Sequence, residues 1–159
     1  MNAAVERYWR QYLATLSADR RPAAYLEAFS FGIEPGDALP IAELVLAGVK
    51  TATGSLLWAR EADGQSIPVA GDFSIVLDAE RQPLCIIETF EVAVRPLDTV
   101  DADFARDGGE GDRSLAYWRE IYWEYVGGEC ARIGRAPSWQ APIVCERFRV
   151  VYRAPLEPA

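Results

Sequence analysis

The amino-acid sequence predicts an α+β fold, in which a curved antiparallel β-sheet or small β-barrel is flanked by helices and carries extra helices at its N-terminus. The chain has 159 residues, of which 50% are apolar, and this is the size of one globular domain with its own core. Apolar residues recur at three- and four-residue intervals in two regions, 5–16 and 115–125, as in amphipathic helices. They alternate along 73–77, 84–94 and 142–152, as in strands with one buried face.

The N-terminal segment is predicted to be helical. Its apolar stripe consists of Val5, Tyr8, Trp9, Tyr12, Leu13 and Leu16. A shorter helix is expected after Arg21-Pro22, because proline is favoured in the first turn of a helix, and it is expected to end near Phe29. We therefore expect residues 1–30 to form a helical cap on a main domain of residues 31–152, with residues 153–159 as a tail.

A third helix is predicted to begin after Asp37, a candidate cap, and to end at Gly48, which suits a left-handed turn. Lys50 then follows just past the end of this helix. Residues 51–58 are rich in threonine and apolar side chains and are predicted to form a strand.

The second half of the chain adds the three alternating strands and one helix between the last two. Asp112 or Ser114 is expected to cap this helix, and Gly127-Gly128 is expected to end it. The strands are expected to pair antiparallel in a curved sheet.

Composition excludes several classes of protein and site. The net charge of −8 disfavours sequence-independent binding to a phosphate backbone. No apolar run approaches the roughly 20 residues that span a bilayer, so no membrane partner is expected. The cysteines, Cys85, Cys130 and Cys145, are far apart and suggest neither a disulfide framework nor a zinc site, which favours the cytoplasm.

The chain contains no histidine, and this removes Ser-His-Asp and Cys-His nucleophile systems and most catalytic zinc sites. A catalytic base would have to be Lys, Asp, Glu, Tyr or Cys. No glycine-rich phosphate loop is present either, so nucleotide triphosphate hydrolysis is not expected, and no cofactor or metal is predicted.

Lys50 is the single lysine of a chain that has fifteen arginines. A lysine can lose its proton when it is desolvated, whereas arginine stays charged, so Lys50 is a candidate for a titrating group. The alternative is that Lys50 has no special role and is a lysine kept by chance in a chain whose codon usage favours arginine. Glu110 lies in a glycine-rich loop and is a second candidate for a functional residue. The alternative is an ordinary loop carboxylate that is exposed to solvent. Glu88 and Glu146 fall on apolar strand faces and are expected to be paired structural acids.

Residues 48–53, Gly-Val-Lys-Thr-Ala-Thr, resemble the Gly-x-Lys-x-x-Thr signature of the ASCH domain family. Segments in the same order also resemble its longer bacterial members, namely 46–48, 55–58, 69–72, 110–115 and 144–148. The likeness covers roughly residues 31–152. It implies a PUA-like fold, similar to that of RNA-binding barrels.

The resemblance also implies candidate site residues. Amidohydrolases of the family remove the acetyl group from N4-acetylcytidine and related acylated cytosines with a lysine, a threonine and a glutamate. By motif position Lys50 would be the proton acceptor and Thr53 the nucleophile, and Glu110 matches the proton donor. A lysine serves as base if burial lowers its pKa, and Lys50 and Thr53 are expected to meet because Gly48 breaks the helix before them.

Four further residues are candidates for substrate binding. Trp58 and Tyr117 would stack on the base, although aromatic residues at such spacings are more often part of a core. Arg113 would hold phosphate if the ligand were RNA, and Ser114 lies beside the predicted acid.

Three functions remain open from the sequence. The first is an amidohydrolase acting on a modified nucleoside or similar small molecule. The second is an RNA-binding domain or a ribonuclease acting on single-stranded RNA, which predicts salt-dependent binding. The third is a regulatory module that binds a nucleoside without turnover. Fold alone does not decide among them.

Overall fold

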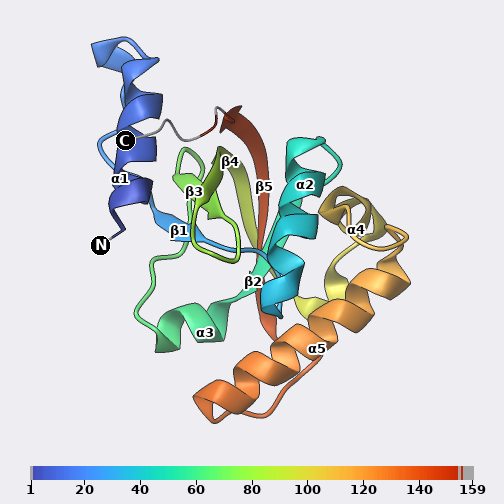
Figure 1. The fold of residues 1–159 in the computed structure, drawn as a ribbon. Coiled ribbons are helices and arrows are strands. Elements are labelled where there is room, and N and C mark those ends of the chain that lie inside the picture. The colour runs from blue at the N-terminus through green and yellow to red at the C-terminus, as the bar shows by residue number, and fades with distance from the viewer. Residues whose placement is uncertain (1, 154, 156–159) are drawn as a thin grey trace.

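The computed structural model describes residues 2–153 and 155 and contains one five-stranded sheet with the strand order β1-β3-β4-β5-β2. The strands are β1 (Glu27–Phe29), β2 (Ala52–Leu56), β3 (Phe73–Leu77), β4 (Pro83–Pro96) and β5 (Pro142–Tyr152). The sheet curls into a half-barrel whose open edges are β1 and β2 (Figure 1). The predicted α+β class is confirmed.

The long strands β4 and β5 pair antiparallel over most of their length and form the backbone of the sheet. β2 and β3 also pair antiparallel with their neighbours, β5 and β4. β1 pairs parallel with β3, and the sheet is therefore mixed at that edge.

Five α-helices pack around the sheet in the described residues: α1 (Ala3–Ala14), α2 (Ala38–Leu46), α3 (Leu57–Ala62), α4 (Ala102–Gly108) and α5 (Leu115–Ile133). Single 3-10 turns lie at Ala18–Arg20, Pro35–Asp37 and Leu97–Thr99. α1 and α2 lie on opposite sides of the sheet in Figure 1. Because neighbouring residues of a strand point to opposite faces, Ile75 packs with α1 while Val76 packs with α2.

The remaining helices cover the end of the sheet formed by β2 and β5. Trp118, Tyr122, Val126 and Cys130, four residues apart, form the buried stripe of α5. They pack in one cluster with residues of β2, α4 and β5. None of the helices in residues 2–153 combines the length and apolar character that a membrane-spanning helix needs.

Three sequence predictions about these elements are wrong. No second helix ends near Phe29, because after one 3-10 turn the chain extends and Glu27–Phe29 joins the sheet. The strand after Lys50 ends at Leu56, so Trp58 lies in α3. α5 runs through Gly127-Gly128 to Ile133, because burial of Val126 and Cys130 outweighs the cost of about 1 kcal/mol per helical glycine.

The boundaries of the predicted segments need the same adjustment. Residues 27–29 belong to the sheet and not to an N-terminal helical cap. The predicted tail, residues 153–159, lies outside the described residues except for Arg153 and Pro155.

Candidate functional site

A cavity of about 510 Å³ lies between the two edge strands of the half-barrel and the face of α5. Its walls come from β1 and the loop after it, from β2, and from α5, with single side chains of α3, β5 and the loop before α5. Its lining residues include Glu27, Phe31, Thr53, Ser55, Arg60, Glu110, Tyr117, Tyr122, Tyr125 and Glu146.

Lys50 lies outside the lining of this cavity, with its side chain almost fully buried. The chain reaches it through Gly48, whose φ of 75° ends the run of α2. The Nζ atom donates hydrogen bonds to the backbone oxygens of Ala52 at 2.9 Å and Gly108 at 3.1 Å, and to Oε2 of Glu110 at 3.0 Å. Burial lowers the pKa of Lys50, and the Glu110 carboxylate opposes this shift.

Glu110 is placed by a loop that passes between Lys50 and Tyr117. Gly109 has φ 77°, and a Cβ atom there would lie 2.8 Å from the Cα atom of Lys50. Gly111 has φ 60°, and its Cβ atom would lie 2.5 Å from ring atoms of Tyr117. Both positions therefore need glycine, and the loop holds the Glu110 carboxylate at the cavity wall with its side chain 25% exposed.

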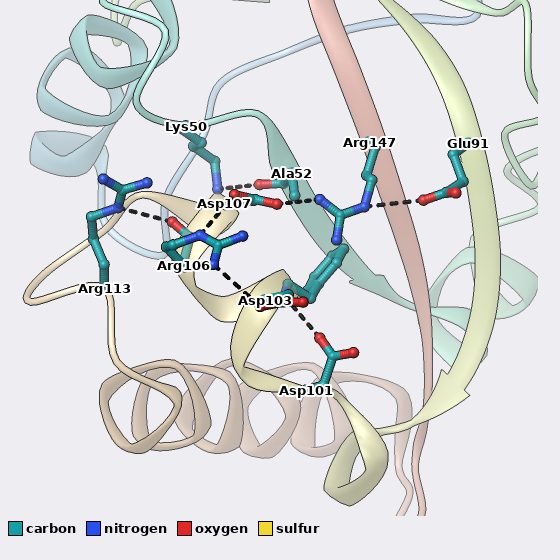
Figure 2. A network of polar contacts seen from close by, with 10 residues as sticks. Lys50, Ala52, Glu91, Asp101, Asp103, Arg106, Asp107, Arg113 and Arg147 are labelled. Carbon is teal, nitrogen blue, oxygen red and sulfur yellow. Dashed lines mark hydrogen bonds and ion pairs between the residues drawn. The ribbon is translucent and has the colours of Figure 1, made fainter.

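A network of polar contacts fixes the C-terminal end of α4, from which this loop departs (Figure 2). Arg147 of β5 forms ion pairs with Asp107 and with Glu91 of β4. The backbone oxygen of Asp107 accepts a hydrogen bond from the nitrogen of Thr51 at 2.8 Å. The segment that carries Lys50 and the loop that carries Glu110 are thereby joined to the same strand pair.

Thr53 lies on the cavity side of β2, directly opposite Glu146 of β5 in the antiparallel register. The side chains of Thr53 and Tyr122 both line the cavity, and Thr53 acts to lower the pKa of Tyr122, as a nearby hydrogen-bond donor does. The Tyr122 hydroxyl also accepts a hydrogen bond from the nitrogen of Gly54 at 3.0 Å, and that of Tyr125 accepts one from Leu56. Burial raises the pKa of Tyr122, so its hydroxyl keeps its proton near Thr53.

The far end of the cavity contains Arg60 and two carboxylates. Arg60 donates hydrogen bonds to Oγ of Ser55 at 2.8 Å, to the backbone oxygen of Ser66 at 3.0 Å and to Oε1 of Glu27 at 3.0 Å. Glu146 is buried and accepts a hydrogen bond from the Thr89 hydroxyl at 3.1 Å. Burial raises the pKa of Glu146, and the Thr89 hydrogen bond and Arg60 oppose that shift.

Of the predicted site residues, Lys50 and Glu110 are brought into direct contact, and Thr53 and Tyr117 line the cavity with Glu110. The three hydrogen bonds of Lys50 do not end on Thr53, although one ends on Ala52, the residue before it. The expected contact between the side chains of Lys50 and Thr53 is therefore not found among the hydrogen bonds of Lys50.

The other three predicted residues lie away from the cavity lining formed by the described residues. Ser114 is the N-cap of α5, where its Oγ accepts a hydrogen bond from the nitrogen of Tyr117. Arg113 donates to the backbone oxygen of Arg106 in an exposed turn. The Trp58 ring packs against the guanidinium of Arg135, 3.6 Å from its centroid.

The sequence did not identify Arg60 and Tyr122 as cavity residues, and it predicted a purely structural role for Glu146. Tyr122 could have been found, because Tyr117, Ile121, Tyr122, Glu124 and Tyr125 follow a helical spacing and form one wall. Arg60 gave no such signal, since residues 57–62 were not predicted to be helical. Among the described residues no group of three or more His, Cys, Asp or Glu side chains is placed to hold a metal ion.

The charge of the cavity wall is strongly unbalanced. Its carboxylates are Glu27, Glu34, Asp37, Glu110, Glu124 and Glu146. In the part of the chain that the structure describes, Arg60 is the one cationic side chain of the lining. An acidic lining of this kind favours a neutral or cationic ligand over a phosphate group.

Comparison with known proteins identifies relatives of the whole chain. The model of the ASCH domain matches residues 27–152. The crystal structure of an ASCH domain from Lactobacillus crispatus JV V101 is similar with a TM-score of 0.90 and 31% identity, covering 96% of this chain and 97% of that one. A protein from Enterococcus faecalis V583 is similar with a TM-score of 0.86 and 29% identity, over 96% and 91% of the two chains. The comparison with curated proteins gives no match.

Proposed function

The chain belongs to the ASCH domain family, within the PUA-like superfamily, and we propose that it is an amidohydrolase that removes the acyl group from N4-acetylcytidine-type nucleosides. The observation that carries this proposal is the buried Lys50–Glu110 pair beside a cavity whose wall contains the Thr53 hydroxyl. A base, an acid and a hydroxyl nucleophile are the groups that acyl transfer requires, and this set needs no histidine.

The cavity suits a nucleoside in size and surface. Its volume of about 510 Å³ lies within the range of about 300–1,000 Å³ that is usual for small-molecule sites. Phe31, Tyr117 and Tyr122 supply aromatic surface against which a flat base can pack. Trp58 and Arg113 lie outside this lining and have no part in the proposed site.

The reactive protonation state arises within the Lys50–Glu110 hydrogen bond. Transfer of one proton from the Lys50 ammonium to the Glu110 carboxylate gives a neutral amine and a carboxylic acid. Burial of Lys50 favours its neutral amine. The amine then turns from the backbone oxygen of Ala52 to the hydroxyl of the next residue, Thr53.

In the first half-reaction, Oγ of Thr53 attacks the acyl carbon and its proton goes to the Lys50 amine. The bond between the acyl carbon and N4 breaks, and the Glu110 acid gives its proton to the departing nitrogen. Cytidine leaves and the acyl group remains as an ester on Thr53. The Tyr122 hydroxyl, which lies in the cavity wall with Thr53, donates a hydrogen bond to the carbonyl oxygen of the acyl group, where negative charge develops.

In the second half-reaction, water attacks the ester carbon and gives a proton to the Glu110 carboxylate. The ester bond breaks and Oγ of Thr53 recovers its proton from the Lys50 ammonium. The products are the free carboxylic acid and the original neutral pair, so protons and bonds balance over the cycle.

The alternative function, an RNA-binding domain or ribonuclease, has less support from the same cavity. Six carboxylates and one arginine in the lining oppose entry of a phosphate backbone. A non-catalytic module could bind a nucleoside in the same cavity, but binding alone does not require the Lys50–Glu110 pair.

The test is chromatographic detection of cytidine released from N4-acetylcytidine by purified protein. Wild type is expected to release cytidine, while Lys50→Arg, which keeps the charge but cannot act as a base, and Thr53→Val, which lacks the hydroxyl, are expected to be inactive. Thr99→Val, a remote exposed threonine, is the matched control and is expected to keep wild-type turnover. Binding of cytidine without release of product would support the regulatory module instead.

A further inference from the structure

Arg60 is a buried cation in the wall of an acidic cavity, with only 7% of its surface exposed. It lies on α3, directly after the edge strand β2 that carries Thr53. Burying a guanidinium is costly unless its N–H groups find acceptors. Its contacts therefore show which of its N–H groups are used within the protein and which are left for a ligand.

Three of the five N–H groups of Arg60 have partners within the described chain: Ser55, Ser66 and Glu27. One N–H remains on each of the two terminal nitrogens. Because the three bonds hold the planar guanidinium in a fixed orientation, the two remaining donors are fixed as well. A ligand that presents two neighbouring acceptors fits such a pair of donors.

Arg60 contacts β2 at Ser55, two residues along the strand from the proposed nucleophile Thr53. Thr53 and Ser55 are two residues apart on β2, so they face the same side and lie about 6.6 Å apart. The Nε atom of Arg60 is 2.8 Å from the Ser55 hydroxyl. A base whose N4 substituent lies at Thr53 can therefore run the edge that carries N4, N3 and O2 along β2 toward Arg60.

We propose that Arg60 is the specificity-determining residue of the site and selects cytosine over uracil. Cytosine presents two adjacent acceptors, the ring nitrogen N3 and the carbonyl oxygen O2, and these remain acceptors when N4 is acylated. In uracil N3 carries a hydrogen, which would face an Arg60 donor and leave it without an acceptor. This inference rests on the proposed function for the identity of the ligand.

The acidic surroundings keep Arg60 in place without competing for its free donors. Glu27 uses one oxygen for one N–H of Arg60. Glu146 interacts with Arg60 through charge, and it accepts a hydrogen bond from Thr89. Arg60 is thus held by a carboxylate of β1 and lies in the field of a carboxylate of β5.

The experiment measures binding of cytidine and uridine by isothermal titration calorimetry, which requires no turnover. Wild type is expected to bind cytidine at least about tenfold more tightly than uridine, the effect of one charge-assisted hydrogen bond. Arg60→Lys keeps the positive charge but lacks the planar guanidinium with its fixed pair of donors. The preference for cytidine over uridine is therefore expected to fall to about threefold or less. Arg135→Lys, which alters an arginine stacked on Trp58 outside the cavity, is the matched control and should keep the wild-type ratio.

Equal binding of the two nucleosides by wild type, binding of neither, or an unchanged ratio in Arg60→Lys would overturn the inference. If thermal unfolding shows that Arg60→Lys is not folded at the assay temperature, Glu27→Gln replaces it. That variant removes the charge that orients Arg60 and is expected to lower the ratio too, whereas an unchanged ratio would count against Arg60. Preference for cytidine without hydrolysis of N4-acetylcytidine would defeat the amidohydrolase proposal alone, and hydrolysis without preference would defeat this inference alone.

Discussion

The Nζ atom of Lys50 lies 3.0 Å from Oε2 of Glu110, although sixty residues separate them in the chain. Lys50 follows α2 and Glu110 precedes α5, and the loop glycines beside Glu110 allow the close approach. A substitution at one of these glycines can therefore block the approach without changing either side chain.

Gly109→Ala is expected to displace Glu110 from Lys50 and to lower turnover by at least about tenfold, since misplacing a reacting group is costly. The left-handed backbone alone costs about 1–2 kcal/mol for a residue with a Cβ, and the contact with the Lys50 backbone adds to it. Turnover and urea unfolding measure the two effects. Gly128→Ala, on the exposed side of α5 with no atom near its Cβ, is the control and should gain about 0.5–1 kcal/mol. Unchanged turnover in Gly109→Ala would show that the loop does not need this backbone path.

Tyr122→Phe is expected to reduce turnover by about 10–100-fold, since it removes the cavity hydroxyl that would donate to the acyl carbonyl oxygen. It also leaves the Gly54 nitrogen without its acceptor, which should cost about 1–3 kcal/mol of stability. Steady-state kinetics and urea unfolding give both values.

The matched variant is Tyr125→Phe, which removes the acceptor of the Leu56 nitrogen two residues along the same strand. It should cost similar stability and much less turnover. Equal losses of turnover in the two variants would mean that the only role of the Tyr122 hydroxyl is to accept the backbone hydrogen bond at the edge of β2.

Glu146→Gln is expected to change how stability depends on pH. Burial raises the pKa of Glu146 above 4.5, so the folded protein holds this proton to a higher pH than the unfolded chain does. The carboxyl therefore contributes stability below about pH 4.5 that is lost as pH rises through the folded pKa. Because the amide has no such loss, the stability of the variant relative to wild type should rise between pH 4 and neutrality.

Urea unfolding at several pH values between about 4 and 8 measures this difference. Glu124→Gln, which changes an exposed carboxyl at the cavity rim, serves as the control. A difference between Glu146→Gln and wild type that stays constant across the range would show that Glu146 is as well accommodated ionised as protonated.

Cytidine 5′-monophosphate is expected to bind at least about tenfold more weakly than cytidine at low salt, because its phosphate meets the carboxylates of the lining. The difference should narrow at high ionic strength, which screens charge repulsion. Calorimetric titrations at two salt concentrations test it. Tighter binding of the monophosphate, weakened by salt, would instead favour the RNA-binding function.

The sequence by itself determined the fold class, most of the strands and the site motif. The alternation along 84–94 and 142–152 is a short-range pattern, and these residues form β4 and β5. The spacing of Gly48, Lys50 and Thr53 identified the family. These features depend on neighbouring residues, so a linear reading reaches them. Ser114, one of two candidate caps, is likewise the N-cap of α5 because a cap is a local device.

Only the tertiary structure decided where the chain departs from local preference and which side chains share the cavity. Packing on β3 turns residues 27–29 into a strand, and burial of one face carries α5 through Gly127-Gly128. The meeting of Thr53 with Tyr122, and the place of Arg60 and Glu146 in one wall, depend on strand order and helix docking. Such contacts join residues far apart in sequence, and their energies exceed local propensities of about 1 kcal/mol or less per residue, so no local pattern encodes them.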